Sequence, residues 1–225
     1  FTINVQSVNA APTDIDLTST SVNENLPAGS LVGELSSTDP NTSDTHTYSL
    51  VAGTGSTDNA SFQISGDELQ TNASFNFEAE NNYSVRIRTT DNGGLSFEKV
   101  FAITINNVNE APTNISLSSN NVNEGLPVGT VVGEFTTTDP DAGGSHSYSL
   151  VAGTGSDDNA SFQIDGDELQ TSAIFDFETK PSYSIRVRTT DNGSLFFEKE
   201  FTINVQSVNA APTDIDLTST SVNEN

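Results

Sequence analysis

The stretch YSVRIRTTDNGGLSFEKVFAITINNVNEAP, residues 83–112, decides the fold of this chain. Apolar residues in its two halves alternate with polar, basic or small ones: Tyr83, Val85 and Ile87 in the first half, and Phe101, Ile103 and Ile105 in the second. Alternation with a period of two is typical of β-strands that bury one face. The turn-forming segment TTDNGG lies between the two runs, so the stretch predicts two successive strands.

Shorter strand candidates precede this pair. They lie at residues 15–17, 31–35, 45–50, 62–64 and 68–71. Seven short strands in about 100 residues, separated by turn residues, are typical of a Greek-key β-sandwich. No stretch has the apolar spacing of an amphipathic helix over three turns. The sequence therefore predicts an all-β fold of seven-stranded sandwiches, and the pair Asp165-Gly166 predicts a tight hairpin turn because both residues accept a positive φ.

The whole pattern occurs twice. The tripeptide Ala-Pro-Thr stands at residues 11–13, 111–113 and 211–213, and the landmarks between these points recur in register. The prediction is a tandem array joined end to end: residues 1–10 as the last strand of a preceding module, 11–110 as module 1, 111–210 as module 2, and 211–225 as the first strand of a following module.

A second repeat has twice this period. Residues 1–25 and 201–225 are identical, whereas residues 101–125 differ from both. The natural unit is therefore a pair of modules, and an array of such pairs behaves as a quasi-one-dimensional object. We expect the chain to begin and end inside a longer array.

The charge and composition restrict the function. The net charge of −24 comes from 31 acidic residues against 7 Lys and Arg. Such a surface repels nucleic acid and anionic lipid, and divalent metal is its natural counter-charge. The chain has no Cys, so oxygen atoms must hold any metal. No apolar run approaches the about 18 residues of a membrane-spanning helix, and we expect no membrane insertion in this segment.

Most of the acidic residues that recur between the modules stand beside Pro, Gly or Asn at predicted strand ends and loops. Calcium takes six to eight oxygen ligands, which such loops can supply. Five motifs resemble those of cadherin repeats over essentially the whole chain: Val122-Asn123-Glu124, Asp139-Pro140-Asp141, Phe175-Asp176-Phe177-Glu178, Thr190-Asp191-Asn192-Gly193, and the linker Asn107-Val108-Asn109-Glu110-Ala111-Pro112. The linker has the shortened form common in bacterial cadherin-like proteins.

The resemblance implies Ca²⁺ bound between consecutive modules. At the complete central joint it implies nine candidate ligands: Glu24, Asn76 and Glu78 from module 1, Asn107, Asn109 and Glu110 from the linker, and Asp139, Asp141 and Asp191 from module 2. At the outer joints it implies five more: Asp39, Asp91, Glu124, Asp176 and Glu178.

The chain departs from the family pattern at four positions. Asn76 and Asn41 replace expected aspartates, and the outer linkers carry Ala10 and Ala210 where the central one has Glu110. We therefore expect calcium occupancy to alternate along the array, with the stronger site at the central joint.

Other interpretations of these residues stay open. An acid in a turn is often a turn residue only, and this is the interpretation for Asp157, Asp158, Asp165 and Asp167. His46 and His146, each alone in a strand, are expected at the surface. Lys99 and Lys199 suggest either Lys-Asn cross-links or pairing across strands with acids. Several Asn-X-Ser/Thr sequons leave glycosylation open.

The function predicted is structural. A chain whose linkers are fixed by calcium becomes a rod, and calcium at about 10⁻⁴ to 10⁻³ M acts outside the cell. We expect a segment of an extracellular bacterial fibre, adhesin stalk or matrix protein, with neighbouring modules and identical chains as partners. The alternative is an adhesion module that binds a carbohydrate or another such chain. No nucleophile motif singles out a Ser, so we do not expect an enzyme.

Overall fold

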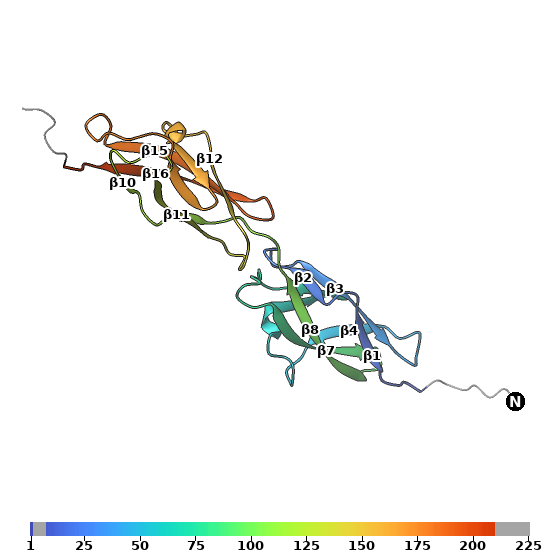
Figure 1. The fold of residues 1–225 in the computed structure, drawn as a ribbon. Coiled ribbons are helices and arrows are strands. Elements are labelled where there is room, and N and C mark those ends of the chain that lie inside the picture. Colours follow the sequence, from blue (N-terminus) through green and yellow to red (C-terminus); the bar gives the residue numbers. More distant parts are fainter. Residues whose placement is uncertain (2–7, 210–225) are drawn as a thin grey trace, which may run out of the picture. The chain divides into compact units, whose positions relative to one another are not determined.

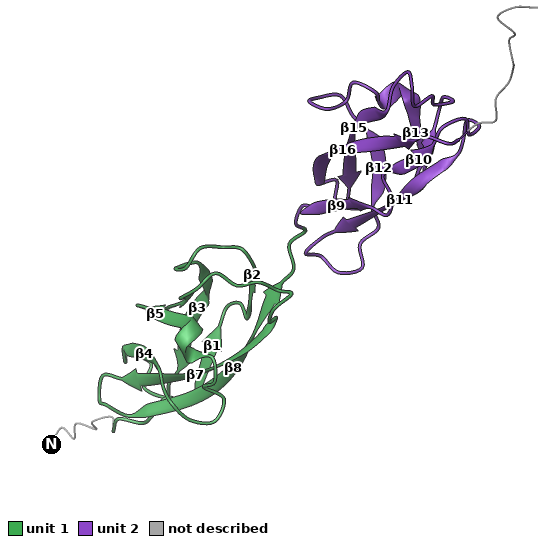
Figure 2. Ribbon diagram, turned by 90° about the vertical axis from the view of Figure 1, so that its left-hand side faces the viewer, with its two compact units in different colours: residues 1–109 green, residues 110–225 purple. Residues whose placement is uncertain are grey.

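The computed structural model describes residues 1 and 8–209. The chain divides into two compact units, residues 1–109 and 110–225 (Figure 2). The division falls inside the predicted linker, between Asn109 and Glu110. The partial modules predicted at residues 1–10 and 211–225 lie, apart from residues 1 and 8–10, outside the described residues.

Unit 1 is a sandwich of two four-stranded sheets (Figure 1). The first sheet has the order β1-β3-β6-β5, with β1 at Asp14–Leu17, β3 at Leu31–Thr38, β6 at Glu68–Thr71 and β5 at Phe62–Ser65. The second has the order β2-β8-β7-β4, with β2 at Ser21–Asn23, β8 at Ser96–Asn106, β7 at Asn82–Asp91 and β4 at His46–Leu50. One turn of 3₁₀ helix, Asn59–Ser61, precedes β5.

Unit 2 repeats this architecture. Its first sheet has the order β9-β11-β14-β13, with β9 at Asn114–Leu117, β11 at Val131–Thr138, β14 at Glu168–Thr171 and β13 at Phe162–Asp165. Its second has the order β10-β16-β15-β12, with β10 at Asn121–Asn123, β16 at Phe196–Gln206, β15 at Ser182–Thr190 and β12 at Ser147–Leu150. A 3₁₀ turn at Asn159–Ser161 again precedes the hairpin.

The all-β sandwich prediction is confirmed, with one strand more in each unit than the seven expected. The extra strand, β2 or β10, is three residues long and pairs in parallel with the last strand of its unit. Val22 is its only buried residue in unit 1. A single apolar residue produces no alternation, and for this reason the sequence did not predict the strand.

The alternating residues of the opening stretch form the centre of the core of unit 1. Val85, Ile87, Ile103 and Ile105 are each fully buried. In the equivalent hairpin of unit 2, Ile185, Val187 and Ile203 are also fully buried. Burying one such aliphatic side chain contributes about 1.5–3 kcal/mol relative to leaving it exposed. The hairpin β7–β8 therefore supplies much of what holds the two sheets together.

The predicted hairpin turn is displaced by one residue. Strand β13 extends through Asp165, and Gly166-Asp167 form the turn. Gly166 takes the positive φ of 63°, whereas Asp165 pairs with Glu168 across the hairpin. Only one turn residue needs the left-handed conformation, and glycine provides it without steric cost.

The two Lys residues for which cross-links or pairing with acids were predicted join the first and last strands of each unit by hydrogen bonds. Lys99 Nζ donates to Asp14 Oδ1 at 2.8 Å and to the Ile15 carbonyl at 2.8 Å. Lys199 Nζ donates to Asn114 Oδ1 at 2.9 Å. Pairing with an acid is confirmed for Lys99, and in unit 2 an amide takes the place of the carboxylate.

An arginine fork lies on the outer face of the β7–β8 hairpin. Arg86 Nε and Arg88 Nε donate to the two carboxylate oxygens of Glu98, at 2.8 and 2.9 Å. The hydrogen bonds from Arg88 and Arg86 hold the pKa of Glu98 below its ordinary value.

We expect this fork to make stability depend on pH. Because the pKa of Glu98 is lower in the folded chain than in the unfolded one, the stabilisation is present at neutral pH and is lost as pH falls through the lowered pKa. Glu98→Gln should therefore lower the urea midpoint at pH 7 and leave it unchanged at a pH below that pKa. Glu34→Gln, an exposed carboxylate opposite Glu68, is the control. An equal effect of Glu98→Gln at all pH values would contradict the assignment.

Candidate metal centres

The first group of ligands lies where the chain enters unit 1, and we call Asp39, Asn41, Asp44 and Asp91 its entry cluster. Asp39 follows β3, Asn41 and Asp44 lie in the β3–β4 loop, and Asp91 ends β7. Carboxylate oxygens of Asp39, Asp44 and Asp91 lie within 4.8 Å of one another. None of these three side chains is fully exposed, and Asp91 is buried.

Hydrogen bonds from the linker fix the entry cluster of unit 1. The Ala10 N–H donates to Asn41 Oδ1 at 2.7 Å, and Asn9 Nδ2 donates to Asp91 Oδ2 at 3.0 Å. Burial opposes ionisation of Asp91, but hydrogen bonds from the Leu95 N–H and from Asn9 outweigh it and hold its pKa below the ordinary value. The cluster is therefore prepared as an array of oxygen acceptors at neutral pH.

The two histidines are not the isolated surface residues expected. His46 Nε2 lies 3.1 Å from Asp39 Oδ2, and its side chain is 13% exposed. His146 Nε2 lies 2.7 Å from Asp139 Oδ2, and its side chain is 14% exposed. The expectation was wrong because His46, the first residue of β4, and His146, just before β12, each face the loop that carries the aspartate of their own unit. Strand periodicity does not reveal this contact.

The second group lies where the chain leaves unit 1. Glu24 follows β2 and is only 2% exposed. Its Oε2 accepts the Phe77 N–H at 2.7 Å, and its Oε1 accepts the Val108 N–H at 2.8 Å. Glu24 thus ties the β6–β7 loop to the outgoing linker. Carboxylates that accept two backbone N–H groups form strong, charge-assisted hydrogen bonds.

The other predicted ligands at this end of unit 1 lie in the β6–β7 loop and the outgoing linker, which Glu24 joins. Asn107 Nδ2 donates to Glu78 Oε1 at 3.4 Å. Asn76 Oδ1 accepts the Ala79 N–H at 2.8 Å, so the asparagine that replaces an expected aspartate closes a local turn. Asn109 is the last residue of the unit.

The entry cluster of unit 2 comprises Asp139, Asp141 and Asp191. Asp141 Oδ2 accepts the Glu110 N–H at 2.7 Å, and Asp139 Oδ1 accepts the Asp141 N–H at 3.0 Å. Asp191 is buried, and its Oδ1 accepts the Leu195 N–H at 2.8 Å. The hydrogen bond from the linker N–H repeats that of unit 1, with Glu110 in the position of Ala10.

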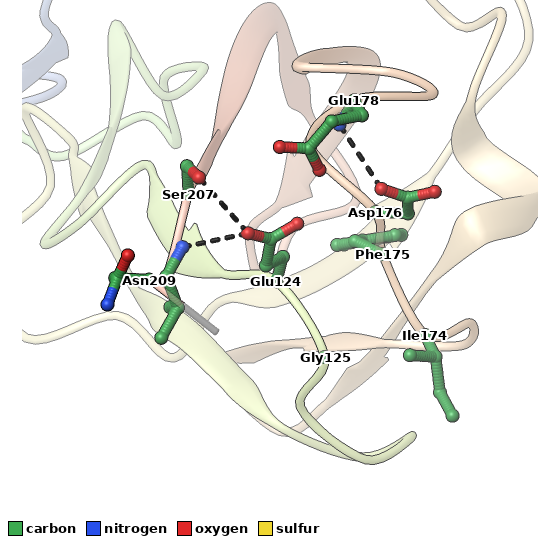
Figure 3. A pocket seen from close by; sticks show the side chains of 9 residues that line it. Glu124, Gly125, Ile174, Phe175, Asp176, Glu178, Ser207 and Asn209 are labelled. Carbon is green, nitrogen blue, oxygen red and sulfur yellow. Dashed lines mark hydrogen bonds between the residues drawn. The ribbon is translucent and has the colours of Figure 1, made fainter. Parts of the chain in front are cut away.

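The exit cluster of unit 2, Glu124, Asp176 and Glu178, lines an open pocket together with Ser207 and Asn209 (Figure 3). Carboxylate oxygens of the three acids lie within 4.8 Å of one another. Glu124 Oε1 accepts the Val208 N–H at 2.8 Å and the Ser207 hydroxyl at 3.2 Å. In Figure 3 the carboxylates of Glu124 and Glu178 point toward each other.

The carboxylates of this exit cluster differ in acidity. Hydrogen bonds from the Phe177 and Val208 N–H groups hold the pKa of Glu124 below its ordinary value. A backbone hydrogen bond lowers the pKa of Glu178, but burial and the charges of Glu124 and Asp176 outweigh it and raise the pKa overall. A raised carboxyl pKa caused by like-charged neighbours shows electrostatic repulsion that a bound cation would relieve.

The donor set fits a hard divalent cation. All the grouped ligand atoms are carboxylate oxygens, with Asn side chains and backbone groups nearby, and calcium prefers such oxygen ligands whereas zinc favours sulfur and nitrogen. Within the described part of the chain, Asp44 Oδ2 is buried and has no hydrogen-bond partner. A buried, unpaired carboxylate oxygen is costly, and a bound cation would remove that cost.

The structure brings the outer-joint residues together within single units. Asp39 lies with Asp91, and Glu124 with Asp176 and Glu178. The nine residues of the predicted central joint are divided, with Glu24, Asn76, Glu78, Asn107 and Asn109 in unit 1 and Glu110, Asp139, Asp141 and Asp191 in unit 2. That they share calcium stays a prediction. The sequence missed Asp44, although Gly144 at the equivalent position was a signal that this loop differs between the repeats.

Comparisons with known proteins agree with this architecture. The model of the cadherin domain family matches residues 118–206. Human protocadherin gamma-C5 is 32% identical over 200 residues, which are 83% of this chain and 21% of that protein. The chain thus spans about a fifth of the length of this curated relative.

Two solved structures show the same fold. Protocadherin gammaB7, in a cis-dimer structure of its domains EC3-6, has a TM-score of 0.61 and 25% identity and covers 88% of this chain, which covers 48% of it. Human protocadherin-24 EC1-2 has a TM-score of 0.68 and 20% identity and covers 90% of this chain, which covers all of it. Among the described residues, no helix is long and apolar enough to cross a membrane.

Proposed function

Because the chain consists of two cadherin-like domains, we propose that it is a calcium-dependent structural segment of the extracellular part of an adhesion or stalk protein. The observation that carries this proposal is the gathering of carboxylates where the chain enters unit 1 and where it leaves unit 2. Linker N–H groups donate hydrogen bonds to the carboxylates of Glu24 and Glu124. When bound, calcium would supply the positive charge that holds these carboxylates together. The residues themselves orient the linker by hydrogen bonds.

Calcium acts in this proposal by removing freedom from the linkers. Residues 107–110 join two folded domains, and a linker whose residues share an ion with both domain ends can no longer bend freely. The excess of 31 acidic over 7 basic residues would otherwise make successive domains repel. A bacterial fibre or matrix is one setting for such a segment; the relatives compared are animal protocadherins, and a bacterial source stays a prediction.

We expect calcium to bind and to straighten the chain. Titration calorimetry of the 225-residue chain should show several calcium ions bound, with dissociation constants of about 10⁻⁴ to 10⁻³ M. Small-angle scattering should show a longer maximum dimension in calcium than in chelator. Magnesium at the same concentration is the control for charge screening. Absence of calcium binding, or identical scattering with and without calcium, would refute the proposal.

A second candidate function is adhesion to another copy of the chain. The cis-dimer formed by protocadherin gammaB7 supports it. The apolar side chains of Val128 and Ile174, which are exposed on unit 2, support it as well. Unit 1 has Ala28 and Ser74 at the equivalent positions, so these two exposed apolar side chains are particular to unit 2. Sedimentation in calcium tests this second function, since a chain that stays monomeric does not bind its own copies. Glycan binding by the isolated chain would favour the carbohydrate alternative instead.

A further inference from the structure

The β3–β4 loop of unit 1 and its counterpart in unit 2 place their acids differently. The sequence is DPNTSDTH at residues 39–46 and DPDAGGSH at residues 139–146. Each loop has two aspartates, and the first occupies the same position in both. The second is Asp44 in unit 1, opposite Gly144, and Asp141 in unit 2, opposite Asn41. The number of carboxylates is thus equal, although their positions differ.

Asn41 accepts a hydrogen bond from the linker as Asp141 does, but it lacks the negative charge of Asp141. The Ala10 N–H donates to Asn41 Oδ1 at 2.7 Å, as the Glu110 N–H donates to Asp141 Oδ2 at 2.7 Å. An N–H donor needs only an oxygen acceptor, so an amide serves as well as a carboxylate here. The amide has no charge, however, and it cannot supply the electrostatic attraction that a carboxylate offers a cation.

Asp44 has the properties of the missing carboxylate. One of its oxygens lies within 4.8 Å of oxygens of Asp39 and Asp91. Its Oδ2 is buried and, within the described residues, has no hydrogen-bond partner. Three carboxylates so close repel one another, and nothing in the loop requires an acid at residue 44, because Gly144 serves in the other repeat. Both the repulsion and the unpaired oxygen are relieved by a bound divalent cation.

We infer that Asp44 supplies the calcium-binding carboxylate that Asn41 lacks, so that the charge of the entry cluster of unit 1 is preserved by relocation within the loop. This inference rests on the proposed function, in which these clusters bind calcium. It also revises the expectation from the sequence that the Asn41 replacement weakens the outer joint. Of the differences between the two entry clusters, only Ala10 in place of Glu110 then remains uncompensated.

The experiment uses the full 225-residue chain, with hydrogen exchange measured by mass spectrometry during a calcium titration. Peptides that cover residues 39–46 and 139–146 report the two loops separately within one molecule. In Asp44→Asn, the calcium concentration for half-maximal protection of loop 39–46 should rise about tenfold or more, since affinity follows the ligand charge count. Protection of loop 139–146 should not change.

Three further variants make the test specific. The double variant Asp44→Asn with Asn41→Asp should regain the parent response, because the carboxylate returns to its position in the other repeat. Asp67→Asn, an exposed acid in the β5–β6 turn, removes the same charge and should have no effect. In unit 2, Gly144→Asp adds a carboxylate and should increase the calcium sensitivity of loop 139–146. A Cβ at residue 144 fits there, because its nearest atoms would lie at 3.7–4.0 Å.

The outcomes separate this inference from the proposed function. If Asp44→Asn leaves loop 39–46 as sensitive to calcium as in the parent chain, the relocation is refuted while calcium binding stands. If the double variant does not recover, Asp44 acts through loop structure rather than through its charge, and the relocation is again refuted. If calcium protects neither loop in the parent chain, the proposed function fails and the inference fails with it.

Discussion

Replacing Glu24 with alanine should lower the free energy of unfolding of unit 1 by about 3 kcal/mol, even without calcium. The Glu24 side chain is 2% exposed, and its two oxygens accept the N–H groups of Phe77 and Val108. Hydrogen bonds to a charged group contribute about 1.5–3 kcal/mol each. The alanine variant would lose both bonds and leave two N–H groups unpaired, while removal of a buried charge offsets part of the loss.

Urea unfolding in the presence of chelator measures this effect. Glu34→Ala is the matched control, since Glu34 is an exposed carboxylate on β3 that faces Glu68 on the neighbouring strand. Removing one of two like charges should leave the urea midpoint unchanged or raise it slightly. A Glu24 variant as stable as the Glu34 variant would show that the carboxylate serves only as a metal ligand and does not support the loop.

Calcium itself should produce the second large effect. At 10 mM free calcium, a site with a dissociation constant of about 10⁻⁴ M stabilises the folded state by about 2.7 kcal/mol. For a domain of about 100 residues, 1 kcal/mol corresponds to roughly 4–8 °C. The melting temperature in calcium should therefore exceed that in chelator by about 10 °C or more.

A comparison with magnesium distinguishes specific binding from charge screening. Magnesium demands near-ideal octahedral geometry and loses its water reluctantly, so carboxylates on flexible loops should favour calcium. We expect 10 mM magnesium to raise the melting temperature by much less. Equal shifts in the two salts would mean that a chain of net charge −24 responds to ionic strength alone.

Much of the fold was predictable because its core consists of long alternating strands. Val85, Ile87, Ile103 and Ile105 were identified from the period of two and are all fully buried. Strand β2 was not, since its pairing depends on the tertiary position of β8 and not on a pattern of its own. The turn at Gly166 was displaced for a related reason, because cross-strand pairing extended β13 by one residue.

The site was predictable where a motif has a fixed position relative to a strand end. Asp39 and Asp91, at the ends of β3 and β7, were identified and lie together. Asp44 was not, because its approach to them depends on the path of an irregular loop. His46 was misplaced for the same reason, since alternation predicts the face of a residue on its own sheet but not its neighbours in a loop.

The parallel pairing of β2 with β8 has a consequence for how each domain responds to tension. A pull on the two ends of the chain draws β2 towards its N-terminus and β8 towards its C-terminus. Because these strands run in the same direction, their ladder, extended by the bonds from Thr104 N–H to Thr20 and from Glu24 N–H to Asn106, is sheared as a whole. We expect these bonds to break together under such a load rather than one after another, so that the short strand β2 resists extension of the domain.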